Sequence, residues 1–135
     1  MKNKFIFFLT AFLLLSSCQV DFDNHLKRET ESYTHKHCPM RIEEGNTLDS
    51  MTYDINTRTL TRWHTLSGIM DSPASREAFA NHPDLIRNQL LMELRGDVEK
   101  QTCKDEGIFF RYVFRSSATG QNIFTTTFSL SDYIR

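Results

Sequence analysis

A short, mainly apolar run near the N-terminus limits how much of this chain can join a folded domain. The run covers residues 5–15 and follows Lys2 and Lys4. As a helix it would extend about 16 Å, roughly half of a ~30 Å hydrocarbon core, so it is too short for a stable membrane span. A basic start, a short apolar stretch and the small residues Ser16 and Ser17 are the pattern of a secretory signal peptide. We therefore expect residues 1–17 to be removed and to take no part in the mature fold.

The residue that follows the predicted cut is a cysteine. The four residues from Leu15 to Cys18 resemble the lipobox of bacterial lipoproteins, whose pattern is leucine, two small residues and cysteine. The resemblance implies that Cys18 carries a diacylglycerol thioether and an acylated amino group. Two or three acyl chains anchor a protein stably, whereas one gives only marginal binding. The alternative is an ordinary secretory signal followed by an incidental cysteine.

The resemblance also bears on location. By the sorting rule of enteric lipoproteins, Gln19 in place of an aspartate after the cysteine implies the outer membrane. We expect a lipid-anchored protein of the cell envelope, at the outer membrane and on its periplasmic face. The alternative is the cell surface, since acidic residues such as Asp21 and Asp23 near the anchor resemble an export signal of some Gram-negative groups. Taken as a whole, the chain resembles small bacterial lipoproteins of unknown function, which implies a location and no activity.

The mature chain divides into a polar leader and one domain. Loss of Lys2 and Lys4 lowers the formal net charge from −1 to −3, and no basic cluster is denser than Lys27-Arg28. We therefore expect no nucleic-acid partner. Residues 18–37 are polar and lack a sustained periodicity, so we expect a lipidated flexible tether there. Residues 38–135 suffice for a single domain with one core.

Two cysteines remain once Cys18 is assigned to lipid. Cys38 and Cys103 lie in a chain that we expect to enter an oxidising compartment. We predict a disulfide bond between them, and closing a loop of about 65 residues would stabilise the fold by roughly 4 kcal/mol. The alternatives are two free thiols or one catalytic thiol.

The pattern of the domain predicts an α+β fold. Residues 47–55 and 58–69 have the composition of a strand hairpin, with a bulge near Trp63 or cover on both faces as alternatives. The cap signal at Ser72 and the apolar spacing that follows predict a helical segment at about 72–102. Residues 107–115 and 122–130 predict a second hairpin. We expect an antiparallel sheet of four to five strands in the order β-β-α-β-β, with the helical segment packed on one face.

The histidines are the only candidates for metal or catalytic chemistry. On an extended strand His35 and His37 would share a face and, with His25, could bind a metal such as zinc. No second cluster supplies a further ligand at a recognisable spacing, so we predict no metal and no cofactor, with His35 and His37 as weak candidates. His64 and His82 are isolated, and we expect a half-buried strand residue and a helix cap.

No catalytic motif is found in the sequence. It contains no nucleophile elbow, no zinc-protease helix and no phosphate-binding glycine loop. We predict a protein that is not an enzyme, a membrane-anchored accessory module that binds another envelope protein as well as the lipid bilayer. The alternative function is a small-ligand or metal-binding envelope protein, or a minor hydrolase, that uses His35 and His37 or His64.

Overall fold

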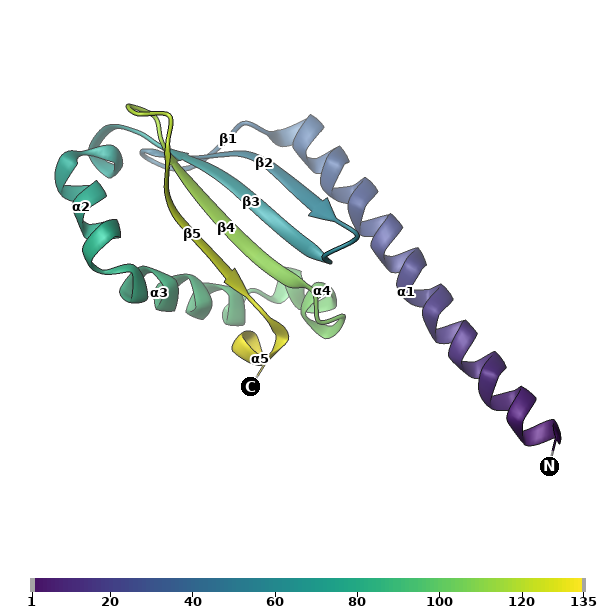
Figure 1. The fold of residues 1–135 in the computed structure, drawn as a ribbon. Coiled ribbons are helices and arrows are strands. Elements are labelled where there is room, and N and C mark those ends of the chain that lie inside the picture. The colour runs from purple at the N-terminus through teal and green to yellow at the C-terminus, as the bar shows by residue number, and fades with distance from the viewer. Residues whose placement is uncertain (1, 135) are drawn as a thin grey trace.

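A computed structural model of the protein describes the backbone of residues 2–134 and the side chains of residues 18–134. The fold is α+β, with helices packed against one five-stranded sheet (Figure 1). The side chains of the predicted signal peptide, residues 1–17, lie outside the described residues. Within the described part of the chain, no helix combines the length and the apolar character needed to cross a bilayer.

The sheet is mixed rather than purely antiparallel. It contains β1 (Met40–Glu43), β2 (Asn46–Asp54), β3 (Thr59–Leu66), β4 (Phe109–Ser116) and β5 (Asn122–Phe128), side by side in this order. Neighbouring strands are antiparallel except β3 and β4, which are parallel. The predicted antiparallel sheet in the order β-β-α-β-β is therefore wrong at this junction, and three strands precede the crossover. Parallel neighbours require a long crossover, which residues 67–108 provide.

Both predicted hairpins are confirmed. β2 pairs with β3, and β4 pairs with β5. The register of the first hairpin shifts between Leu48 and Ser50, so Asp49 is an extra residue in a bulge opposite Trp63. This is one of the two alternatives that the sequence left open. Because of the bulge, Leu48 before it and Met51 after it both face the helices.

The predicted helical segment at about 72–102 is divided into shorter helices. These are η1 (Gly68–Asp71), α2 (Pro73–Asn81), α3 (Pro83–Gly96), η2 (Val98–Lys100) and α4 (Gln101–Asp105), and α5 (Leu130–Tyr133) follows β5. Ser72 caps α2 as predicted, because its Oγ accepts from the Ser75 N–H at 3.2 Å. The division at His82 arises because a proline restricts the residue before it, and His82 has φ −129° and ψ 50°.

The predicted flexible tether is instead part of a long helix. α1 (Lys2–His37) includes all of residues 18–37, and its C-terminal half packs beside β2 (Figure 1). Phe22, Leu26, Thr30 and Tyr33 recur at four- and three-residue spacing and lie on the side of the helix that faces the sheet. Residues 18–37 are polar on average, but this narrow stripe is apolar enough to dock on the domain.

The core lies between the helices and the sheet. Its buried residues are Leu26, Tyr53, Leu60, Leu66, Leu94, Ile108, Phe110, Tyr112, Phe114, Phe128 and Tyr133. α1 contacts β2, whereas α2 and α3 contact β5 at the far side of the sheet. The middle of this face, over β3, therefore lies between two groups of helices.

Candidate functional site

The gap between α1 and the η2–α4 segment forms a groove of about 710 Å³. We call it the central groove. Its apolar lining includes Leu26, Met51 and Leu60, and its charged lining includes Arg28, Glu29, Arg62 and Lys100. An apolar floor with polar groups at its borders is the usual form of a binding site in a soluble domain.

A smaller pocket of about 260 Å³ adjoins the central groove at its β1 side. The two hollows share Arg62 and Lys100 in their lining. The ring of His64 stacks on that of Phe114 with centroids 4.8 Å apart. Its Nδ1 lies 2.9 Å from Asn46 Oδ1, and Arg62 Nε donates to its Nε2 at 3.4 Å. These contacts favour the tautomer in which Nδ1 carries the hydrogen.

The environment of His64 keeps its imidazole neutral. Burial lowers the pKa of His64 to about 4, and the positive charge of Arg62 acts in the same direction. Its polar partners are an amide and a guanidinium, and none of the described side chains offers it a hydroxyl, a thiol or a carboxylate as a hydrogen-bond partner. A nucleophile–base pair needs such a partner within hydrogen-bond reach. Among the described side chains, His64 therefore forms no nucleophile–base pair in this structure.

The structure does not bring the candidate metal ligands together. His35 and His37 lie on α1 rather than on a strand, so their side chains point about 200° apart around the helix. The ring of His37 lies 4.9 Å from that of Tyr33, and His25 Nε2 lies 3.0 Å from a Glu29 carboxylate oxygen. Among the described residues, no three His, Cys, Asp or Glu side chains form a group that could hold a metal ion. The shared face on which the two candidates depended is absent.

All three cysteines are free in this structure, so the predicted Cys38–Cys103 disulfide is not seen in it and stays a prediction. Cys38 follows the C-terminus of α1, with Arg62 and Asp49 as its charged neighbours, whereas Cys103 lies in α4 near Glu29. Burial raises the pKa of both thiols, which makes them poor nucleophiles. Cys18, the predicted lipid-attachment residue, is exposed.

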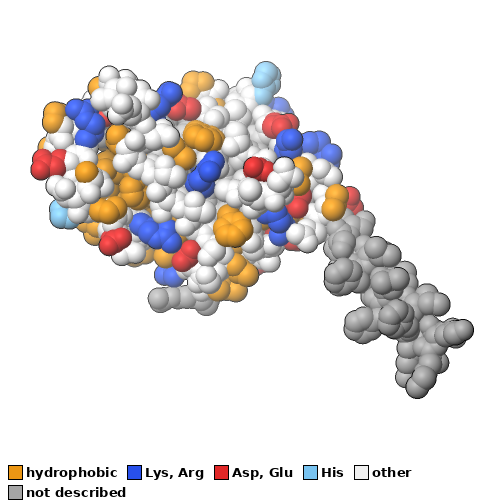
Figure 2. Space-filling model, viewed as in Figure 1, with side chains coloured by type: hydrophobic (Ala, Val, Ile, Leu, Met, Phe, Trp, Pro, Cys, Tyr) orange, Lys and Arg blue, Asp and Glu red, His pale blue; other side chains and the backbone are white. Residues whose placement is uncertain are grey.

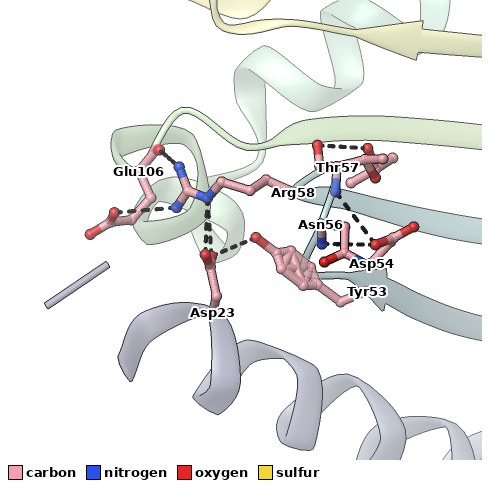
Figure 3. A network of polar contacts seen from close by, with 8 residues as sticks. Asp23, Tyr53, Asp54, Asn56, Thr57, Arg58 and Glu106 are labelled. Atoms are coloured by element: carbon pink, nitrogen blue, oxygen red, sulfur yellow. Dashed lines mark hydrogen bonds and ion pairs between the residues drawn. The ribbon is translucent and has the colours of Figure 1, made fainter. Parts of the chain in front are cut away.

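A polar network fixes α1 to the rest of the domain (Figure 3). Asp23 is buried, and its Oδ1 accepts from Tyr53 Oη at 2.7 Å and from Arg58 Nε at 3.1 Å. Arg58 Nη1 also donates to the carbonyl oxygen of Glu106 at 3.1 Å. Burial and then the Asp23 carboxylate raise the pKa of Tyr53 above its ordinary range, so its phenol stays protonated and donates. The network ties α1, the β2–β3 turn and the end of α4 together.

Sequence reasoning missed most of the residues that build the site. The sequence places Asp23 in the predicted tether, and it places Tyr53 and Arg58 only in the two strands of the first predicted hairpin. The available signal was the spacing of Phe22, Leu26 and Tyr33, which is helical although the surrounding residues are polar.

Two solved structures share this fold. A protein from Pseudomonas aeruginosa that is assigned to the secreted proteins matches with a TM-score of 0.69 and 16% identity, over 85% of this chain and 95% of its own. The pilotin of the type 2 secretion system from Vibrio vulnificus matches with a TM-score of 0.66 and 11% identity, over 89% of this chain and 98% of its own. At these identities the likeness shows the fold alone.

A comparison of sequences places the chain in a family. No curated protein matches it. A family model described as Domain of unknown function (DUF8479) matches residues 21–124, which include most of the predicted tether and nearly all of the sheet. The match begins two residues before Asp23, so the family model includes the part of α1 that packs on the sheet. The chain therefore belongs to the family described as Domain of unknown function (DUF8479).

Proposed function

We propose that this chain is a non-enzymatic accessory protein of the cell envelope, anchored by lipid on Cys18, which binds a segment of another envelope protein in the central groove. The central groove is the observation that carries the proposal. Its volume of about 710 Å³ exceeds the 260 Å³ of the adjoining pocket, and its lining has an apolar floor between charged borders. The likeness to a pilotin supports an envelope protein, and in particular a secretion-system component, as the partner.

The shape and charge of the central groove fit an amphipathic helix. Its α1 wall runs from His25 to His37, about 18 Å along the helix axis, which matches about three turns of a partner helix. The floor of Leu26, Met51 and Leu60 would take apolar side chains at helical spacing. Charges of both signs on the borders would fix the direction and register of the bound segment.

The His64 pocket extends the same site. Since it shares Arg62 and Lys100 with the central groove, one bound segment can enter both. His64 lines this pocket as a neutral imidazole stacked on Phe114, so it does not require a counter-ion in the partner. We assign His64 to the floor of the binding site.

Site-specific photo-crosslinking in intact cells tests the groove. A benzophenone amino acid in place of Tyr33, which lines the groove, should give a crosslink to one envelope protein. The same group in place of Thr125, which is exposed on β5 outside the groove, serves as the matched control and should give none. Ser32→Trp places a large side chain in the groove from an exposed position and should reduce the Tyr33 crosslink. Equal products from Tyr33 and Thr125, or none from Tyr33, would contradict the proposal.

Fatty-acid labelling tests the anchor. Label should be incorporated by the natural chain and by Cys38→Ala, and it should be lost in Cys18→Ala. Fractionation should then place the labelled protein with the outer membrane, and added protease should not reach it in intact cells if it lies on the periplasmic face. Label that persists in Cys18→Ala would overturn the lipid attachment.

A further inference from the structure

One end of the sheet carries exposed apolar side chains beside the point where α1 leaves the domain. Phe109 at the start of β4, Leu130 and Ile134 at α5, and Val20 on α1 are 41%, 41%, 60% and 57% exposed. We call these four residues the anchor-end patch. Figure 1 shows α4, α5 and the β2–β3 turn at the end of the sheet from which the N-terminal half of α1 projects, and Figure 2 shows hydrophobic side chains at the lower end of the domain, where α5 lies.

Short contacts connect the members of this patch to the base of α1. The Phe109 N–H donates to the Arg58 carbonyl oxygen at 2.8 Å, and the side chain of Arg58 holds Asp23. The side chain of Leu130 packs against Gly107, since a Cβ atom added to Gly107 would lie 3.4 Å from Leu130 Cδ2. The Ile134 N–H donates to the Leu130 carbonyl oxygen. The apolar side chains therefore belong to the same rigid unit as the helix that bears Cys18.

The distance from Cys18 to this unit is short. Asp23, the first buried residue among the described side chains of α1, lies five residues after Cys18, which corresponds to about 8 Å of helix. The headgroup layer on each side of a bilayer is about 5–8 Å thick. The side-chain amide of Gln19 also lies beside Arg58, and with its oxygen turned toward the guanidinium it would accept from Arg58 Nη1 at 3.2 Å. A lipid on Cys18 would thus bring this end of the sheet to the membrane surface without a tether between them.

We propose that the anchor-end patch lies in the surface of the lipid bilayer next to the acylated Cys18 and gives the domain a fixed orientation on the membrane. The inference rests on the proposed lipid attachment. A few apolar side chains bind a bilayer only weakly, but the anchor keeps them at a high effective concentration beside it.

The contact is apolar rather than electrostatic. Arg58 is held by Asp23 and Glu106, and the buried amine of Lys104 donates to the carbonyl oxygens of Leu94 and Arg95. The contact should therefore not depend on anionic lipid. In this orientation the central groove, which runs along α1 away from the patch, remains open to the periplasm.

Fluorescence quenching by brominated lipids tests the orientation. The acylated protein is purified, placed in vesicles of phosphatidylethanolamine and phosphatidylglycerol, and studied in a Trp63→Phe background, which removes the only natural tryptophan. Phe109→Trp should be quenched by brominated lipid, and so should Ile134→Trp, a mild change at an exposed position. Ile69→Trp is the matched control, since Ile69 is 79% exposed in η1 beyond the opposite end of β3, and it should not be quenched.

The outcomes separate the two proposals. If the protein floats with the vesicles but neither patch position is quenched, or Ile69→Trp is quenched equally, the orientation is wrong and the lipid anchor stands. If the natural chain floats no better than Cys18→Ala, the anchor is wrong and the orientation fails with it. Quenching of both patch positions should persist in vesicles made without phosphatidylglycerol, and its loss there would contradict an apolar contact.

Discussion

Asp23→Ala tests whether α1 is docked on the domain through the polar network. The change removes the acceptor of two hydrogen bonds, from Tyr53 Oη at 2.7 Å and from Arg58 Nε at 3.1 Å. A hydrogen bond to a charged group contributes about 1.5–3 kcal/mol, and a buried donor left unpaired costs about 1–3 kcal/mol. The side chain of Arg58 is 22% exposed and keeps its bond to Glu106, so its share is reduced by solvent screening.

Together these terms predict a loss of about 2–3 kcal/mol in the free energy of unfolding, out of about 5–15 kcal/mol for a domain of this size. With a urea slope of about 2 kcal/mol/M, the midpoint of unfolding should fall by about 1–1.5 M. Asp21→Ala is the matched control, because Asp21 is exposed on the same helix two residues earlier, and its effect should stay within about 0.5 kcal/mol.

A double-mutant cycle with Tyr53→Phe assigns the loss to the network. Since Tyr53 and Asp23 share one hydrogen bond, the double variant should be more stable than the sum of the single losses predicts, by about 0.5–3 kcal/mol. The reasoning is refuted if Asp23→Ala behaves like Asp21→Ala. That result would mean that the polar network does not hold α1 on the domain.

Three further predictions concern other parts of the fold. Between pH 6.5 and about 4 the unfolded chain binds a proton at His64 that the folded chain does not. The free energy of unfolding should therefore fall on acidification by up to about 3 kcal/mol. In urea titrations at several pH values, His64→Gln should reduce this dependence on pH. Cys38 and Cys103 should both react with maleimide after denaturation without reductant, and a mass spectrum showing neither adduct would contradict the free thiols. Arg87 donates to Thr126 Oγ1 at 2.6 Å, and its guanidinium carbon lies 4.3 Å from the centre of the Phe128 ring. Arg87→Ala and Arg87→Lys should each lower the free energy of unfolding by about 1–2 kcal/mol. Full stability of Arg87→Lys would refute a role for the planar guanidinium.

Features that depend on nearby residues were predictable from the sequence. The two hairpins follow from alternating apolar residues on either side of short turns, and the start of α2 follows from the side chain of Ser72 and the ring of Pro73. The bulge near Trp63 was one of two alternatives, because Trp63 has the opposite parity to Leu60 and Leu66, but the extra residue, Asp49, lies in β2. Each of these signals lies within about ten residues of the feature that it specifies.

Features that depend on distant residues were not predictable in the same way. Nothing near β3 indicates that its second neighbour is β4, which follows some forty residues later in a parallel direction. α1 is the same kind of case. The polar composition of residues 18–37 favours disorder, and only the fold brings Met51 to Thr34 and Tyr53 to Asp23.

The candidate site combines both difficulties. Its walls come from residues 25–37, 51–62 and 99–103, three segments that only the tertiary fold brings together. His64 was expected as a half-buried strand residue, and its burial follows from the stacking of Phe114 across the parallel pair of strands. The weak metal candidates His35 and His37 would share a face only on a strand, and α1 is a helix, so their side chains lie on different sides of it.

Hydrogen exchange along α1 tests most directly the claim that joins the groove to the membrane anchor. If α1 is docked, the backbone amides of residues 26–37 in the purified protein should exchange about as slowly as those of β3 and β4, because both open only on global unfolding. In Asp23→Ala the protection should fall along the whole segment. Rapid exchange throughout residues 26–37 in the natural chain would contradict the docked helix, and with it the wall of the central groove and the fixed orientation on the membrane.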